Sequence, residues 1–137
     1  MTYDIRLKRV YLPAEESDGA RVLVDRLWPR GKRKEDLECD AWLQDAAPSA
    51  ALRRAWHRDA IDADAFVRDY TNELKARAEC LLPLMRHARR GAVTLLTATR
   101  DPEHSHLPTL CRVLLAELDR EDREDGSGPS SPVCYDR

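Results

Sequence analysis

The chain of 137 residues is predicted to fold as a single α/β domain, a small and mostly parallel sheet flanked by helices. Two observations carry this prediction. Continuous apolar runs at residues 22–24 and 92–99 are typical of strands buried on both faces. Elsewhere, apolar residues recur at helical spacing. We expect about three or more strands in a domain spanning residues 2–120, followed by a flexible tail at 121–137.

Charge and hydropathy exclude several classes of protein. The chain has 23 basic and 25 acidic residues and a net charge of −2, which argues against a general nucleic-acid binder but leaves room for a local basic patch. The first residues have no apolar core like that of a signal peptide, and no apolar run approaches the ~20 residues of a membrane span. We therefore expect a soluble, cytoplasmic protein with no membrane partner.

The four cysteines are scattered and form no C-x-x-C pair, so free thiols in a reducing cytosol are expected and a zinc site is not. They are Cys39, Cys80, Cys111 and Cys134.

The first half of the chain predicts two strands and two short helices. Residues 5–11 alternate apolar and polar side chains, as in a strand. The polar link 12–19 leaves the relative direction of strands one and two open, with a parallel arrangement favoured. Asp40 is a plausible N-cap of a short helix that carries Trp42, Leu43 and Ala46, and Ser49 can cap the next helix.

The second half predicts long helices around the second buried strand. The longest helical pattern spans residues 64–90, and Pro83 should kink or split it. After the strand, Asp101 and Pro102 suit an N-cap and the first helical position. The apolar face of this last helix ends at Leu118, and the periodicity is lost from Asp119 onward.

Charged residues follow both buried strands directly. Asp25 and Arg26 follow the first, Arg100 and Asp101 follow the second, and Arg30 lies in the turn after the first. If the strands are parallel neighbours, these residues meet at the sheet edge where α/β proteins bind ligands. Because arginine forms bidentate hydrogen bonds with carboxylate and phosphate, we predict a site for a small anionic ligand. Free N–H groups near residues 101–105 would add to it.

The same residues allow other interpretations. An equally supported interpretation is that Asp25 and Asp101 each pair with an arginine as structural salt bridges. His106 with Asp25 or Asp101 would make a reasonable acid–base pair, because histidine titrates near neutrality. Ser105 lacks the G-x-S-x-G context of a nucleophile. A metal site at Asp101, His104 and His106 is not expected, since residues two apart lie on different sides of a helix.

Two sets of candidate residues result. The catalytic candidates are Asp25, Asp101 and His106; the ligand-binding candidates are Arg9, Arg26, Trp28, Arg30, Arg100, His104 and Ser105. Trp56 is expected in the core, and His57 is given no role. No G-x-G-x-x-G or P-loop motif occurs, and the sequence indicates no particular cofactor. It leaves open whether the protein is an enzyme and what its oligomeric state is. The alternative function is a non-catalytic interaction module, for protein or nucleic acid, that uses the same arginines.

Several segments resemble the YeaO-like bacterial family, a DUF488-type domain of unknown function. They are Lys8-Arg9-Val10-Tyr11, the stretch from Arg21 to Gly31 that includes Leu-Val-Asp-Arg-Leu-Trp-Pro-Arg-Gly, Trp42-Leu43 with Ala47-Pro48-Ser49, and Val93-Thr94-Leu95-Leu96 with the stretch from Arg100 to His106. The resemblance implies the fold and the place of the site, but no activity. Longer relatives carry a Cys-His-Arg triplet where this chain has Ser105-His106-Leu107, so any thiol chemistry of those relatives does not carry over.

Overall fold

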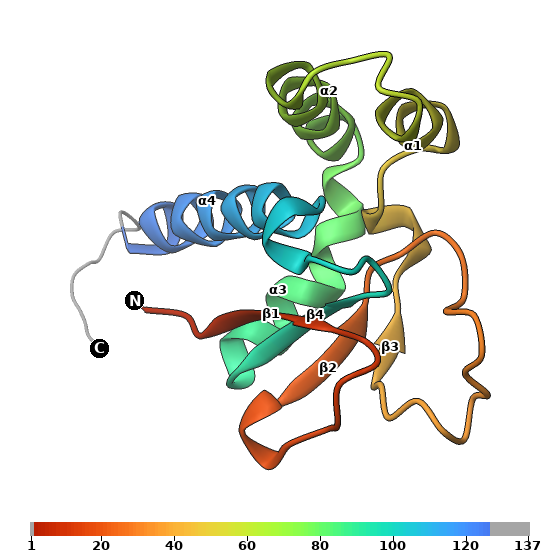
Figure 1. Cartoon of the computed structure of the whole chain (residues 1–137). Helices are drawn as coiled ribbons and strands as arrows, with labels where there is room; N and C mark the ends of the chain where they lie inside the picture. The colour runs from red at the N-terminus through yellow and green to blue at the C-terminus, as the bar shows by residue number, and fades with distance from the viewer. Residues whose placement is uncertain (1, 127–137) are drawn as a thin grey trace.

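The computed structural model describes residues 2–126, which form a four-stranded parallel sheet with helices packed against it (Figure 1). The strand order is β1-β4-β2-β3, and all neighbouring strands are parallel. The strands are β1 (Ile5–Arg9), β2 (Ala20–Leu23), β3 (Ala41–Trp42) and β4 (Val93–Thr97). The predicted α/β class with a small parallel sheet is therefore confirmed.

The central strand β4 is buried along its whole length, because both of its faces are covered. Val93 and Leu95 face a large core, and Leu96 faces a smaller one on the opposite side. The register places Leu95 beside Leu7 of β1 and Val22 of β2. This two-sided burial explains why the strand consists of apolar and threonine side chains without a charged residue, rather than an apolar–polar alternation with an exposed face.

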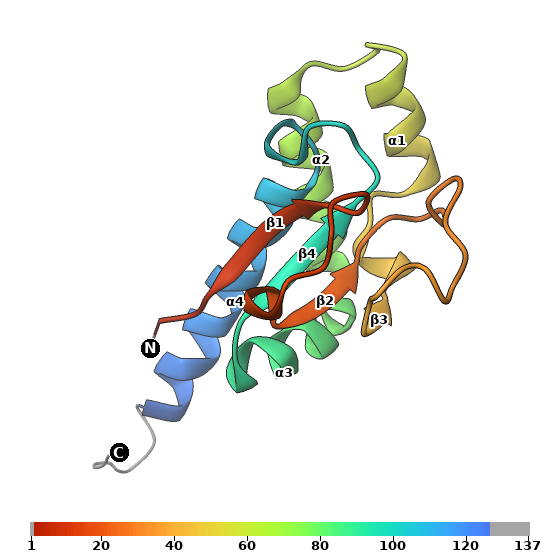
Figure 2. The same cartoon turned by 60° about the horizontal axis from the view of Figure 1, so that its bottom comes forward.

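Helices cover one face of the sheet, and loops cover the other (Figure 2). The helices are α1 (Ala50–His57), α2 (Ala63–Ala76), α3 (Leu82–Arg90) and α4 (Leu107–Gly126). Their buried side chains, such as Tyr70, Leu84 and Leu114, complete the large core. On the other face, Val10 and Leu37 from the loops close the smaller core.

The link between β1 and β2 must pass β4, which lies between them. It includes a 3₁₀ turn, Glu16–Asp18, and ends at Gly19. Gly19 has φ +65°, and a Cβ atom there would lie 2.2 Å from the carbonyl oxygen of Ala92, so only glycine fits. Because β1 and β2 each pair in parallel with β4, they run in the same direction, as favoured from the sequence.

The predicted helix after Asp40 is wrong. This segment forms strand β3 and then a 3₁₀ turn, Gln44–Ala46. The reason is pairing with β2: the Asp40 amide donates to the carbonyl oxygen of Arg21 at 2.6 Å, and the Asp40 carboxylate accepts from the Arg21 amide at 2.8 Å. The next expectation is confirmed, since Ser49 Oγ accepts a hydrogen bond from the amide of Leu52 at the start of α1.

The long helical pattern is split, but ahead of Pro83. Helix α2 ends at Ala76, and a 3₁₀ turn, Ala78–Leu81, connects it to α3. Pro83 lies in the first turn of α3, where backbone N–H groups have no hydrogen-bond partner within the helix. The N–H group that proline lacks is therefore not needed there.

The last helix starts later and ends later than the sequence predicts. Residues Pro102–His104 form a separate 3₁₀ turn, and α4 begins at Leu107. The helix passes the expected domain boundary at residue 120, and Arg89 holds this end through ion pairs with Glu121 and Asp122, both at 2.7 Å. The rest of the predicted tail, residues 127–137, lies outside the described residues.

No helix within residues 2–126 combines the length and apolar character needed to cross a membrane. Cys39, Cys80 and Cys111 are free thiols, and Cys134 falls outside the described range.

Candidate functional site

A pocket of about 470 Å³ opens at the carboxyl ends of β2 and β4. Eight of the ten candidate residues line it, all except Arg9 and Asp101. The complete lining consists of Tyr11, Asp25, Arg26, Leu27, Trp28, Pro29, Arg30, Ala47, Pro48, Arg53, Trp56, His57, Phe66, Ala98, Thr99, Arg100, His104, Ser105 and His106. The parallel pairing of β2 with β4 brings the two charged strand ends together, as expected for this kind of sheet.

Asp25 ties the two strand ends to each other. Its carboxylate accepts a hydrogen bond from the Thr97 hydroxyl at 2.8 Å and another from the Ala98 amide at 2.7 Å. The side chain is only 15% exposed. Both carboxylate oxygens thus have donors from the β4 end, so Asp25 forms part of the pocket floor.

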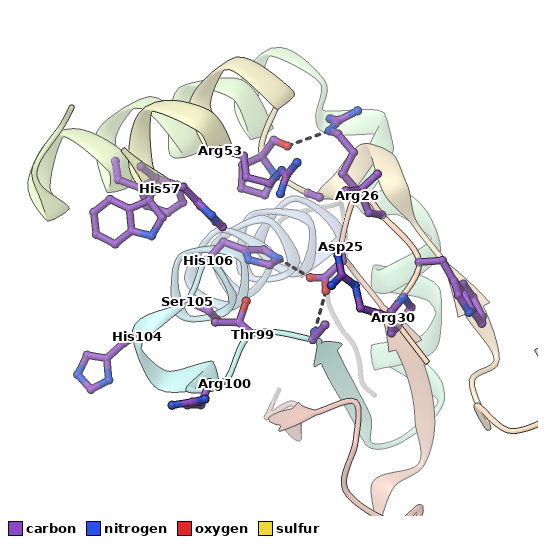
Figure 3. Close-up of a pocket in the computed structure, with 18 of the residues that line it drawn as sticks. Asp25, Arg26, Arg30, Arg53, His57, Thr99, Arg100, His104, Ser105 and His106 are labelled. Carbon is purple, nitrogen blue, oxygen red and sulfur yellow. Dashed lines mark hydrogen bonds and ion pairs between the residues drawn. The ribbon is translucent and has the colours of Figure 1, made fainter. Parts of the chain in front are cut away.

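His106 lies beside Asp25 (Figure 3). Its Nε2 atom is 2.7 Å from the carbonyl oxygen of Val24 and 3.5 Å from a carboxylate oxygen of Asp25. Because a carbonyl oxygen can only accept, Nε2 carries the hydrogen. Burial lowers the pKa of His106, although the Asp25 charge and the Val24 carbonyl oppose this effect. The ring is therefore neutral at pH 7, and its Nδ1 atom makes no hydrogen bond within residues 2–126.

The lowered pKa of His106 predicts that stability falls as the pH drops below the ordinary histidine value of about 6.5. In that range the unfolded chain binds a proton that the folded chain resists, so acid favours unfolding. Urea denaturation at pH 7.5 and 5.5 should show a larger loss of unfolding free energy for the wild type than for His106→Gln. Equal losses in the two proteins would contradict this assignment.

Four arginines surround or rim the pocket, and none forms an ion pair within the described part of the chain. Arg26 donates through Nε to the carbonyl oxygen of Pro48 at 3.0 Å, and the Nε atom of Arg53 is buried without a hydrogen-bond partner there. Arg30 and Arg100 are exposed. Arg26, Arg30 and Arg53 lie around Asp25 and His106, with Arg100 at the rim (Figure 3). The alternative in which Asp25 pairs with an arginine is therefore absent from residues 2–126.

The remaining candidates have other contacts. Arg9 lies over the ring of Tyr11, with 4.8 Å between the guanidinium carbon and the ring centroid. Asp101 pairs with Nδ1 of His104 at 2.6 Å on the surface, where His104 is 83% exposed and projects away from the pocket floor. The hydrogen bond from His104 lowers the pKa of Asp101.

The prediction of free N–H donors near residues 101–105 is wrong, because α4 begins only at Leu107 and the amides of Glu103, His104 and Ser105 are hydrogen-bonded within the 3₁₀ turn. The Asp101 carboxylate accepts from the amide of Glu103 at 3.1 Å, and Ser105 Oγ accepts from the amide of Leu107 at 3.1 Å. Ser105 Oγ also donates to the carbonyl oxygen of Pro102 at 2.6 Å. The serine thus connects the 3₁₀ turn to α4.

Sequence reasoning missed the wall that α1 and α2 contribute. Arg53 and Trp56 of α1 and Phe66 of α2 line the pocket, as does His57. Trp56 packs against Phe66 with ring centroids 4.8 Å apart, so the expectation that it belongs to the core is only partly correct. The three-residue spacing of Arg53 and Trp56 places them on one helix face, but the sequence does not show that this face meets the strand ends.

Within residues 2–126, no three His, Cys, Asp or Glu side chains gather in a way that could hold a metal ion. In particular, His104 and His106 point to different surroundings, one to the surface and the other to the pocket floor.

The parallel sheet with a charged pocket at its carboxyl edge places this chain among α/β domains with a candidate ligand site, and comparison with known proteins identifies the family. The chain belongs to the DUF488-N3i family, described as "Inactive DUF488-N3 subclade", which matches residues 4–136. The YeaO-like resemblance is confirmed by 42% identity over 103 residues to "Uncharacterized protein YeaO" of Escherichia coli K12. That match covers 75% of this chain and 90% of the relative.

"Uncharacterized protein Rv3073c" of Mycobacterium tuberculosis H37Rv is 41% identical over 110 residues, which cover 80% of this chain and 92% of the relative. No solved structure matches the chain.

Proposed function

We propose that the pocket binds a small anionic ligand that carries a phosphate or carboxylate group. The observation that supports this proposal best is the imbalance of charge around the pocket. Four arginines contribute to its lining, whereas the one carboxylate that lines it among residues 2–126, that of Asp25, already accepts hydrogen bonds from Thr97 and Ala98. An anion in the pocket would give these guanidinium groups charge-assisted hydrogen bonds, each worth about 1.5–3 kcal/mol.

The concave shape favours this function over the alternative of an interaction module. A strip of arginines for a protein or nucleic acid would be flat and exposed, whereas this site is hollow and has aromatic walls. A cytoplasmic location, where small phosphorylated metabolites are abundant, is part of the same proposal.

The proposal includes no catalytic step. The Nε2–H group of His106 is directed at Val24, and Asp101 does not line the pocket. The acid–base pair considered from the sequence would thus depend on Nδ1 of His106 alone. The word "inactive" in the family description is consistent with a binding role. We therefore assign to Asp25 and His106 the shaping of the pocket floor.

Arg30 offers the cleanest test because it is exposed and lies in a turn. The Arg30→Ala variant is expected to bind inorganic pyrophosphate about tenfold more weakly than the wild type, through loss of about one charge-assisted hydrogen bond. Its unfolding free energy should change by less than ~1 kcal/mol. Isothermal titration calorimetry and urea denaturation measure the two quantities.

Arg54→Ala is the matched control, since Arg54 is an exposed arginine of α1 that does not line the pocket. It should bind pyrophosphate like the wild type. If pyrophosphate fails to bind the wild type, or if both variants weaken binding equally, the anion site is wrong.

A further inference from the structure

The pocket lining combines two kinds of chemistry. Trp56, Phe66 and Pro48 contribute apolar surface, whereas Arg26, Arg30 and Arg100 supply positive charge. A bare phosphate would use only the cationic groups and would leave the aromatic surface in contact with water. The combination instead fits a ligand that has an anionic group at one end and a flat apolar ring at the other.

Trp56 is suited to be a stacking surface for such a ring. It is half-buried, packs against the buried Phe66 with an interplanar angle of 32°, and still lines the pocket. Phe66 in turn lies 5.8 Å from Tyr70 between ring centroids, and Tyr70 is fully buried. The indole thus rests on a fixed aromatic row, so stacking a ligand on it would require little ordering of the protein.

Arg53 lies one helical turn before Trp56 on α1, and both residues line the pocket. Its Nε atom is buried and has no hydrogen-bond partner within the described residues. A buried donor of this kind gains from an acceptor, because leaving it unpaired costs free energy. A phosphate next to a ring on Trp56 would bring such an acceptor within reach of the same helix face.

From these contacts we propose that the anionic ligand is a nucleotide, with its base against Trp56 and its phosphate among Arg26, Arg30 and Arg53. This inference rests on the proposed function and specifies its ligand class. A volume of about 470 Å³ lies within the usual range for a small-molecule site. Base stacking on an aromatic side chain tolerates every base, so the proposal covers purine and pyrimidine nucleotides. The nucleotide could be free or could be the phosphorylated end of a nucleic-acid strand.

Calorimetric titration of the wild type with inorganic phosphate, ribose 5-phosphate, AMP and UMP separates the contributions. AMP and UMP are expected to bind at least about tenfold more tightly than ribose 5-phosphate, because only they carry a base. In Trp56→Leu this advantage should disappear while phosphate binding is retained, and Trp56→Phe should restore most of it. A 5′-phosphorylated trinucleotide that binds more tightly than AMP would identify a strand end as the source; weaker binding would identify the free nucleotide.

The two proposals fail in different ways. If phosphate and ribose 5-phosphate bind but AMP and UMP bind no more tightly than ribose 5-phosphate, the nucleotide assignment is wrong and the anion site stands. If Trp56→Leu weakens phosphate and AMP to the same degree, the tryptophan only supports the fold. If no probe binds, both proposals are wrong.

Discussion

Replacing Asp18 with asparagine is expected to lower the free energy of unfolding by about 3–5 kcal/mol, the usual cost of removing one partner of a buried ion pair. Asp18 is 4% exposed and accepts hydrogen bonds from Lys8 at 3.0 Å and from Arg21 at 2.5 Å. The Arg21 side chain is itself buried, so Asp18→Asn leaves its charge without a counter-ion. Urea denaturation at pH 7 measures the loss.

Glu15→Gln is the matched control, because Glu15 also pairs with Lys8 at 3.0 Å but is 66% exposed. Exposed pairs contribute little, so the control should change the unfolding free energy by less than ~1 kcal/mol. Equal losses in Asp18→Asn and Glu15→Gln would show that burial does not set the importance of this ion pair.

The same cluster predicts acid sensitivity. Burial alone would raise the pKa of Asp18, but hydrogen bonds from Lys8, the Glu15 amide and Arg21 outweigh it, and the net pKa is lowered from 3.8. The resulting stabilisation is present above that pH and is lost as the pH falls through the lower folded-state value. The loss of stability below pH 4 should therefore be steeper in the wild type than in Asp18→Asn.

Replacing Asp25 with alanine is expected to cost about 2–4 kcal/mol, because two donors at the end of β4 would lose their acceptor. These donors are the Ala98 amide and the Thr97 hydroxyl. Besides the lower unfolding free energy, hydrogen exchange at the Ala98 amide should become faster, which localises the effect to the pocket floor.

Asp101→Ala is the control for this variant, since Asp101 is an exposed aspartate at the same sheet edge that lies outside the pocket lining. It should change the unfolding free energy by less than ~1 kcal/mol. Should Asp25→Ala keep the wild-type stability to within ~0.5 kcal/mol, the carboxylate would not hold β2 and β4 together, and the account of the floor would be wrong.

The two buried strands and the charged residues that follow each of them could be predicted from the sequence by itself. The reason is that both signals are local. Burial on two faces requires a continuous apolar run, and the charges that follow it mark where the strand leaves the core. The cap at Ser49 is local too, because its side chain bonds to an amide three residues away.

Tertiary structure alone decided the features that depend on distant partners. Residues 41–42 form a strand because Asp40 meets the backbone of Arg21, a pairing that overrides the local helical pattern. Arg53 and Trp56 reach the pocket because α1 packs beside the strand ends, whereas their spacing only places them on one helix face. Packing between distant segments thus decides which charged residues face the pocket. For this reason Asp101 lies outside the pocket lining, whereas Arg53 is part of it.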